Sequence, residues 1–465
     1  MEDQSRYSEV ITYKRMIRFA LIAPVAGLLS GMWGNIQFFA VYALLVPQTL
    51  ISLIYLFYSF VDAFNDPIIG YLTDRSRKYT KKYGKRYLWI KIGVILSPIF
   101  LILCFIPIST NVIILVIWLL IMMSIYETFL TLLEVSHNSL YPDLFREHAQ
   151  RRKVSAIGSI IGGITLILGA LFIPIMIYMG GGEYQPRAYL FTVIILVAIV
   201  YVLTFPYLKG VKETNEMKSF RTELDDTGKS SSPLREVLGR IFRDRNWLAI
   251  IIANTCFAIA GACMLYGINF FVVSYLELPI ALASFPGVVY SLVAIIFAII
   301  WIKIAKKIGV KKTYSISLFL NSIGFLLFFF VNDILMMALV LAFVGAASSA
   351  NLGVIFQLAQ AEAIDNAAIN SKKREEGTYI GVLRVFSAFS YFFQTLIFAI
   401  VSAISGFDAA LGPGQSFEAK LGLKLQMSLI PFCIIIIGAI LFVFIYKISK
   451  EKALENVNKL IELRL

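Results

Sequence analysis

Long runs of apolar residues, separated by short polar or charged stretches, fill almost the whole chain. Twelve of these runs can cross the hydrocarbon core of a bilayer, which takes about 20 residues of helix. Because backbone N–H and C=O groups cannot stay unpaired in hydrocarbon, and the runs far exceed barrel-strand length, each predicts a transmembrane helix. The expected spans are 15–41, 48–73, 87–107, 111–139, 154–179, 187–208, 246–275, 281–305, 312–331, 334–360, 378–405 and 424–447.

The longest polar connection divides these spans into two groups of six. Residues 209–245 carry many charges and a Gly-Lys-Ser-Ser-Ser-Pro sequence, which indicates a solvated cytoplasmic linker. The sequence therefore predicts an all-α polytopic membrane protein with one six-helix bundle over 1–208 and a second over 246–447. The cytoplasmic tail, 448–465, has the pattern of an amphipathic helix that lies on a surface.

Charge gives these helices an orientation. The chain is 59% hydrophobic and carries a net charge of +13. Of its 42 lysines and arginines, 38 lie in the N-terminus, in alternate connections or in the tail. Since cytoplasmic loops carry the excess of Lys and Arg, we expect both termini in the cytoplasm and the protein in the cell membrane. Anionic headgroups attract such basic clusters, so the charge predicts no nucleic-acid partner.

The sequence contains none of the usual patterns of enzyme chemistry. The four cysteines fall within apolar runs, and His137 and His148 form no catalytic spacing. Residues 228–230 resemble the end of a phosphate-binding loop, but Glu223 stands where that motif needs its first glycine. We therefore expect no catalytic residue, no cofactor and no metal beyond a possible sodium ion. An ion gradient is then the expected energy source.

Two carboxylates interrupt the second apolar run. Asp62 and Asp66 are four residues apart and so share one face of the helix. A carboxylate inside a membrane span costs about 2.5–3.5 kcal/mol on insertion scales, and something must offset that cost. An internal salt bridge could offset this cost. The carboxylates could also reach toward the headgroups, although an Asp side chain is too short to snorkel far. The interpretation that we favour is a site that receives a cation or a proton.

A polar stripe follows one side of the fourth apolar run. Glu127, Thr131, Glu134 and Asn138 recur at steps of four, three and four residues, which places them on one helix face. Such a face is expected to turn toward the protein interior instead of lipid. Carboxylate oxygens from the second and fourth helices together suit a hard monovalent cation, which prefers oxygen ligands.

A short motif follows the second run. Three residues separate Gly70 from the pair Asp74-Arg75, and a basic stretch then leads to the Gly-Lys-Arg sequence 84–86. This resembles the loop signature of the major facilitator superfamily, where the loop acts as a cytoplasmic latch between helices. The positive-inside rule explains the basic residues but not the spacing from Gly70 to Asp74. A similar basic turn at 305–312 lacks the acid.

Other segments narrow this resemblance. Residues 62–70 resemble the second-helix signature of the glycoside-pentoside-hexuronide:cation symporters, the melibiose-carrier-like branch, and of the related lysolipid carriers. Residues 134–144 resemble the end of that family's fourth helix, and 362–365 with 374–377 resemble its loop between helices 10 and 11. The resemblance implies the major facilitator fold and a symporter that works by alternating access.

The same resemblance implies roles for individual residues. The coupling ion, sodium or a proton, would be bound by Asp62, Asp66 and Glu134, and the polar stripe adds Glu127. The cytoplasmic gate would consist of Gly70, Asp74, Arg75, Glu362 and Asp365. Polar and aromatic positions within the spans give the candidate substrate contacts, which are Trp33, Asn35, Tyr58, Asn138, Tyr266, Asn269, Arg384 and Tyr391. Weaker candidates of the same kind are Gln37, Asn254, Tyr290, Asn351 and Gln357.

Charged groups that sugar-transporting members of the family use are missing. No acid occurs from 19 to 61, the fifth run has no arginine, and Arg384 stands about one turn before the family's helix 11 lysine. Arg384 would tie the halves together, contact the substrate, or hold helix 11 to an acid of helix 2 or 4. We predict cation-coupled symport of a small organic solute, a sugar or glycoside first, with a lysolipid or other amphiphile as the alternative.

A third possibility, a membrane receptor or a membrane-embedded enzyme, would need a sizeable soluble domain or a set of catalytic groups, and the sequence has neither. The expected partners are the small-molecule substrate and the lipid bilayer, with no obligatory protein partner.

Overall fold

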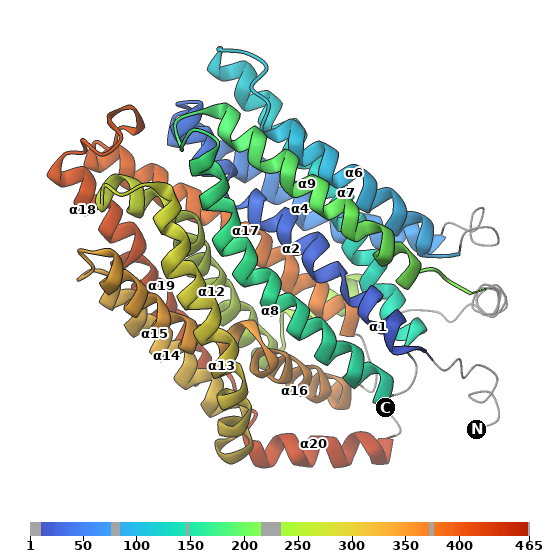
Figure 1. Cartoon of the computed structure of the whole chain (residues 1–465). Coiled ribbons are helices and arrows are strands. Elements are labelled where there is room, and N and C mark those ends of the chain that lie inside the picture. The colour runs from blue at the N-terminus through green and yellow to red at the C-terminus, as the bar shows by residue number, and fades with distance from the viewer. Residues whose placement is uncertain (1–10, 76–83, 146–147, 215–233, 372–375, 464–465) are drawn as a thin grey trace. The chain divides into compact units, whose positions relative to one another are not determined.

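The computed structural model describes residues 11–75, 84–145, 148–214, 234–371 and 376–463, and these residues form helices and no strand (Figure 1). The helices of the first half of the chain are α1 (Tyr13–Ala20), α2 (Ile22–Trp33), α3 (Ile36–Phe38), the π-helix η2 (Phe39–Ala43), α4 (Gln48–Arg75), α6 (Tyr87–Cys104), α7 (Val112–Leu144), α8 (His148–Met179) and α9 (Pro186–Gly210). Those of the second half are α11 (Leu234–Ile241), α12 (Arg245–Phe270), the π-helix η3 (Phe271–Tyr275), the 3-10 helix η4 (Ile280–Ala283), α13 (Ser284–Ile308), α14 (Val310–Phe328), α15 (Ile334–Leu352), α16 (Val354–Ser371), α17 (Glu376–Ser405), the 3-10 helix η5 (Ala409–Leu411), α18 (Phe417–Met427), α19 (Leu429–Ile445) and α20 (Lys450–Leu463).

These helices confirm the prediction of an all-α polytopic membrane protein. Among the described residues, ten helical stretches are long and apolar enough to cross a membrane. The two expected spans outside that set are α4 and α14, helices of 28 and 19 residues that carry four and two charged residues. Two details differ from the expected spans: α7 continues to Leu144, and the run from 334 breaks at Gly353 into α15 and α16.

Contacts divide the chain into two compact units. The first unit comprises Met1–Ile36, Phe64–Gly169 and Gln185–Ser231. The second comprises Gln37–Ala63, Ala170–Tyr184 and Ser232–Leu465. The two bundles expected over 1–208 and 246–447 are continuous segments of the chain, whereas these units combine separate segments. The bundles stay a prediction.

In the first unit, α6 packs against α7 and α9, and α1 and α2 also pack against α9 (Figure 1). Gly93 allows the close approach of α6 to α7, because a Cβ atom there would lie 2.7 Å from the backbone oxygen of Phe129. Arg15 of α1 donates from Nη2 to the backbone oxygen of Lys212 at 2.7 Å. The end of α9 is thereby held to the start of the chain.

In the second unit, α13 and α14 pack against α15, and α12 packs against α17 and α19. Polar contacts join these helices inside the apolar surroundings. The indole Nε1 of Trp301 donates to the backbone oxygen of Ala346 at 2.7 Å, and Nδ2 of Asn351 donates to Oγ of Ser317 at 2.6 Å. Each bond satisfies a polar group that hydrocarbon would leave without a partner.

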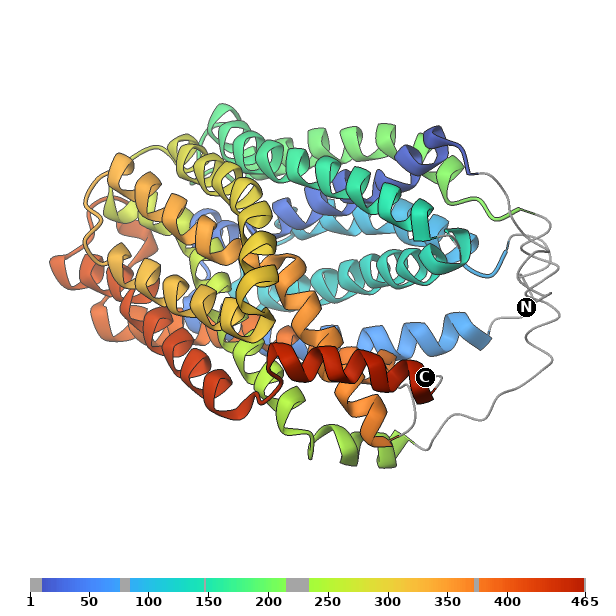
Figure 2. The same cartoon turned by 90° about the horizontal axis from the view of Figure 1, so that it is seen from below.

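The C-terminal helix α20 packs against α16 (Figure 2). Nδ2 of Asn456 donates to Oδ1 of Asn366 at 3.3 Å, and Nζ of Lys450 donates to the backbone oxygens of Lys306 and Lys307 at 3.0 and 3.2 Å. Lys450 therefore caps the C-terminal end of α13, where a cation interacts favourably with the helix dipole. The tail helix, for which the sequence predicts a position on a surface, thus packs against another helix of the same chain.

Glu213 lies near the start of the segment 209–245, for which the sequence predicts a solvated linker. The residue is 4% exposed, and its carboxylate accepts hydrogen bonds from the backbone N–H groups of Lys85, Arg86 and Tyr87, at 3.0, 2.6 and 3.1 Å. These N–H groups open α6 and have no partner within that helix, so the carboxylate acts as an N-terminal cap from a distant part of the chain. Gly84 turns the chain here with φ +96°, and a Cβ there would lie 2.6 Å from the Glu213 carboxyl carbon.

Replacing Glu213 with Ala is expected to lower the free energy of unfolding by about 2 kcal/mol, because buried N–H groups would lose a charged acceptor. The measurement is the thermal midpoint of the purified protein in detergent. Glu418→Ala is the matched control, since Glu418 is exposed at the start of α18. Equal midpoints for both variants would contradict the capping role.

Candidate transport site

Asp66 of α4 and Glu127 of α7 flank a contact between their helices. Nδ2 of Asn65 donates to Oγ1 of Thr128 at 3.3 Å, and these residues are the chain neighbours of the two acids. Asp62 lies one turn earlier on α4, and all three carboxyl side chains are half-buried. The hydrogen bond fixes the register of α4 against α7, so Asp66 and Glu127 belong to one region of the first unit.

The other members of the polar stripe on α7 have different surroundings. Oγ1 of Thr131 is buried and donates to Oε1 of Glu127 at 3.3 Å. Glu134 is half-buried one turn further along, and Asn138 is exposed. His137, between them in the chain, contacts the hydroxyl of Tyr207 through Nδ1 at 2.9 Å, which leaves this part of α7 tied to α9.

Among the described residues, no three His, Cys, Asp or Glu side chains lie close enough to hold a metal ion. A sodium site on α4 and α7 therefore needs further oxygen ligands beside the carboxylates. The hydroxyls of Thr128 and Thr131 and the amide oxygen of Asn65 are of the kind that hard cations prefer. A proton, in contrast, needs a single carboxylate.

An aromatic pair lies next to the acid-bearing part of α7. The rings of Trp33 and Tyr126 stack with centroids 4.9 Å apart and an interplanar angle of 21°. Tyr126 directly precedes Glu127, so the Trp33 ring belongs to the same region of the first unit. Asn35, also a substrate candidate, is buried and donates from Nδ2 to the backbone oxygen of Gly31 at 3.0 Å.

Four tyrosines form a chain of ring contacts in the second unit. Tyr58 meets Tyr55 at 5.9 Å, Tyr55 meets Tyr266 at 6.3 Å, and Tyr266 meets Tyr391 at 5.9 Å, all edge to face. The structure thus connects three of the substrate candidates, which lie on α4, α12 and α17. Sequence reasoning missed Tyr55, although its spacing of three residues from Tyr58 places both on one helix face.

Two further candidates lie on the helices that carry these tyrosines. Asn269 is half-buried on α12, one turn after Tyr266. Arg384 is exposed on α17, one turn before Ser387, whose hydroxyl accepts a hydrogen bond of 2.8 Å from Nδ2 of Asn254. The Asn254–Ser387 bond fixes α12 against α17 at the level of Arg384.

Two glutamines of the second unit are completely buried and have no hydrogen-bond partner among the described residues for either amide atom, namely Gln37 and Gln394. A buried polar group without a partner costs about 1–3 kcal/mol, so each such group in a native protein needs an explanation. Gln37 was among the weaker sequence candidates. Gln394 was missed, and its place one turn after Tyr391 was the signal that pointed to it.

The predicted cytoplasmic gate contains a hydrogen-bonded core. Nη1 of Arg86 donates to Oγ1 of Thr73 at 2.8 Å, and that hydroxyl donates to the backbone oxygen of Gly70 at 3.1 Å. Helix α4 continues through Asp74 and Arg75, whose side chains lie outside the described part of the structure. The motif thus joins the end of α4 to the start of α6, and sequence reasoning did not single out Thr73.

The acids on α16 lie near the end of α19. The hydroxyl of Tyr446 donates to Oε2 of Glu362 at 3.3 Å and lies 3.4 Å from the backbone oxygen of Ala359. Asp365 is half-buried one turn further along α16.

Half-buried acids within membrane-spanning helices are typical of proteins that move ions or substrates across the membrane. The chain belongs to the MFS/sugar transport protein family, whose profile matches residues 20–450. An isoprimeverose transporter from Lactiplantibacillus pentosus is 21% identical over 413 residues, which cover 87% of this chain and 82% of that protein. These findings confirm the resemblance to the major facilitator superfamily and its melibiose-carrier-like branch.

Solved structures of transporters share the fold. A bacterial homologue of the human lysosomal transporter Spinster, inward-facing and unoccupied, has a TM-score of 0.69 at 14% identity, over 96% of this chain and 99% of that one. A D-xylose–proton symporter has a TM-score of 0.63 at 14% identity, over 94% and 98%. The family match and the candidate spans, together with this fold, make the protein an integral membrane transporter of a family of transporters and not of enzymes.

Replacing Gln394 with Leu is expected to raise the free energy of unfolding by about 1 kcal/mol, because an apolar side chain of similar size removes the cost of a buried amide without partners. The thermal midpoint in detergent measures this. Gln357→Leu on the exposed side of α16 serves as the control, for which we expect no gain. A lower midpoint for Gln394→Leu would show that the amide has a stabilising partner.

Proposed function

We propose that the protein is a cation-coupled symporter that carries a sugar or glycoside across the cell membrane by alternating access, with both termini in the cytoplasm. The observation that carries the proposal is the pair of half-buried acids on α4, Asp62 and Asp66, on a helix that the Asn65–Thr128 hydrogen bond joins to the Glu127-bearing part of α7. A membrane span holds such acids at a cost that ion binding offsets. No further cofactor is needed.

The coupling mechanism follows from charge. Asp62, Asp66, Glu127 and Glu134 are four carboxyl groups within spans. Carboxylates that share a low-dielectric region disfavour one another's charged form, so the ionised carboxylates of a site without a bound cation repel one another. A sodium ion or a proton at Asp62, Asp66 and Glu134 removes that repulsion. The occupied carrier then moves between inward and outward access about a central site.

The tyrosine chain on α4, α12 and α17 supports a sugar as the substrate. Ligand sites combine aromatic walls with a small number of polar groups that fix orientation. Tyr55, Tyr58, Tyr266 and Tyr391 supply the rings and hydroxyls, and Asn269 lies one turn away. Sugar transport is also what the family description and the name of the isoprimeverose transporter indicate for those relatives.

Replacing Asp66 with Asn is expected to abolish cation-dependent uptake of isoprimeverose into reconstituted vesicles. The reason is that the amide has no negative charge for a sodium ion or a proton to neutralise. Uptake is measured with radiolabelled sugar across a sodium series and a pH series. The exposed Glu418 supplies the control variant Glu418→Gln, which should transport like the original protein. Cation-dependent uptake that survives in Asp66→Asn protein would refute the coupling site.

The substrate class is tested separately by counterflow with a panel that contains several glycosides and a lysophospholipid. Counterflow of a sugar by the original protein supports the proposal. Counterflow of the lysophospholipid alone would show that the substrate is an amphiphile and not a sugar. The coupling site would still be tested by the Asp66→Asn experiment.

A further inference from the structure

A pocket of about 310 Å³ lies in the second unit, where three segments of the chain come together. Its lining residues belong to 41–49, which lead from η2 into α4, to 399–403 at the end of α17, and to 407–410 around η5. The volume is at the lower end of the range of about 300–1,000 Å³ that is usual for small-molecule sites. The three segments lie at span ends away from the basic loops, where the sequence predicts the outer face.

Gln48 is the first residue of α4 and lines this pocket, which we call the Gln48 pocket. Its side-chain atoms Nε2 and Oε1 are both buried, and neither has a hydrogen-bond partner among the described residues. Such a group needs an explanation, because its hydrogen bonds to water are lost and not replaced. The terminal torsion of a glutamine is soft, so the amide can turn toward the pocket. It then offers a ligand two N–H donors and an acceptor oxygen.

Three further side chains add polar atoms to the lining. Ser402 on α17 is 9% exposed, and Thr49 is exposed on α4. Each hydroxyl can both donate and accept a hydrogen bond. Asp408 accepts the N–H of Ala410 with Oδ1 at 2.9 Å, which holds its carboxylate in place. Because a carboxylate accepts several hydrogen bonds, Asp408 has the capacity for a ligand as well.

Apolar side chains complete the wall of the Gln48 pocket. Val41 and Ala399 are buried, and Phe407 is half-buried. The ring of Phe407 meets those of Tyr42 and Phe270 with centroids 6.4 and 6.3 Å apart, so neighbouring rings hold it. Ligand sites combine aromatic walls with a few polar groups in this way. A sugar ring has the matching features, which are hydroxyls at its edge and C–H groups on its faces.

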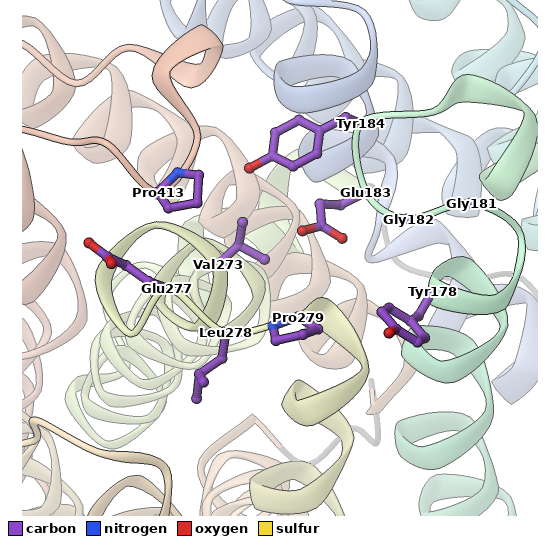
Figure 3. Close-up of a pocket in the computed structure, with 10 residues that line it drawn as sticks. All are labelled: Tyr178, Gly181, Gly182, Glu183, Tyr184, Val273, Glu277, Leu278, Pro279 and Pro413. Carbon is purple, nitrogen blue, oxygen red and sulfur yellow. The ribbon is translucent and has the colours of Figure 1, made fainter.

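A second pocket of the same unit has a different chemistry. It has a volume of about 550 Å³, and its lining contains two acids, Glu183 and Glu277, beside the ring of Tyr184 (Figure 3). Glu277 forms an ion pair with Lys420 at 2.5 Å. Among the described residues, no Asn, Gln, Ser or Thr side chain lines it. This acidic pocket lacks the paired donors and acceptors of the Gln48 pocket, and so it supplies an internal control.

The composition of the Gln48 pocket selects among ligands. Asp408 repels an anion, and a metal ion finds no group of three His, Cys, Asp or Glu side chains among the described residues. An acyl chain would leave the Gln48 amide without partners. We infer that the Gln48 pocket is a peripheral binding site for a neutral sugar ring, whose hydroxyls bond to Gln48, Ser402 and Asp408 while one C–H face lies against Phe407. The choice of a sugar rests on the proposed function.

The peripheral site is separate from the proposed transport site, although one helix carries parts of both. Tyr55 and Asp62 lie seven and fourteen residues after Gln48 on α4, which corresponds to about 10 and 21 Å along the helix axis. A sugar ring at the start of α4 therefore does not reach the coupling acids. It is held near the ends of α4 and α17, the helices that also carry Tyr55 and Tyr391.

The test is protection of a cysteine that lines the pocket. In a background with the four native cysteines replaced, Thr49→Cys is modified in intact cells by a maleimide that does not cross the membrane. Isoprimeverose at ten times its dissociation constant is expected to slow this modification about tenfold. Glucuronate, which is negatively charged, is expected to protect far less. The control is Tyr178→Cys in the acidic pocket of Figure 3, whose modification should not change with sugar.

Two variants of the Thr49→Cys protein test the named contacts. Gln48→Leu is expected to raise the sugar concentration for half-protection about tenfold, the effect of losing the bonds of one amide. Ser402→Ala removes a hydroxyl with a smaller change of volume and should weaken protection in the same direction. Equal modification with and without sugar, equal protection of Thr49→Cys and Tyr178→Cys, or full protection in both variants would each overturn the inference.

The peripheral site and the proposed function fail separately. Asp66→Asn should keep the sugar protection of Thr49→Cys while it loses cation-dependent uptake. Loss of protection in Asp66→Asn would place the protecting sugar at the transport site and overturn the inference. Protection without counterflow of any sugar would refute the proposed function and leave the peripheral site standing. Counterflow without protection would refute the peripheral site alone.

Discussion

Polar groups inside a membrane protein have to find their partners within the protein, and this constraint organises both units. The indole of Trp301 bonds to α15, and the amide of Asn254 bonds to α17. The N–H groups that open α6 find the carboxylate of Glu213, which comes from the far end of α9. These bonds fix how neighbouring helices are placed, so the positions of the acids and tyrosines follow from them.

Four residues of the second unit lie at sites where a local feature costs free energy. Gln37 and Gln394 are buried without hydrogen-bond partners among the described residues, and Leu45 and Glu277 hold strained backbone. Each feature raises the free energy of the conformation in which it occurs. A carrier needs two conformations of similar free energy, and local penalties of this size keep either from becoming a trap.

Much of the helical architecture could be predicted from the sequence, because long apolar runs in a bilayer permit little besides helices. The acids on α4 and α7 also stood out, since a charge in an apolar run is rare. Contacts between distant segments were beyond such reasoning. Nothing in the local sequence of Glu213 indicates burial, and the linker composition around it predicted solvent exposure. Tyr55 and Gln394 were missed although each lies three residues from a candidate tyrosine, because such a spacing does not show which helix the shared face contacts.

Two strained positions differ in their chemistry: Leu45 and Glu277 both have a positive φ, and each lies two residues before a proline. Lys420 forms an ion pair with Glu277 at 2.5 Å, and Glu183 lies on the facing loop, where burial raises its pKa. The pocket beside Leu45 also contains Asp408. The strained turn at Glu277 is therefore held in part by an ion pair, which added salt weakens, whereas the turn at Leu45 has no charge of its own and no such dependence on salt.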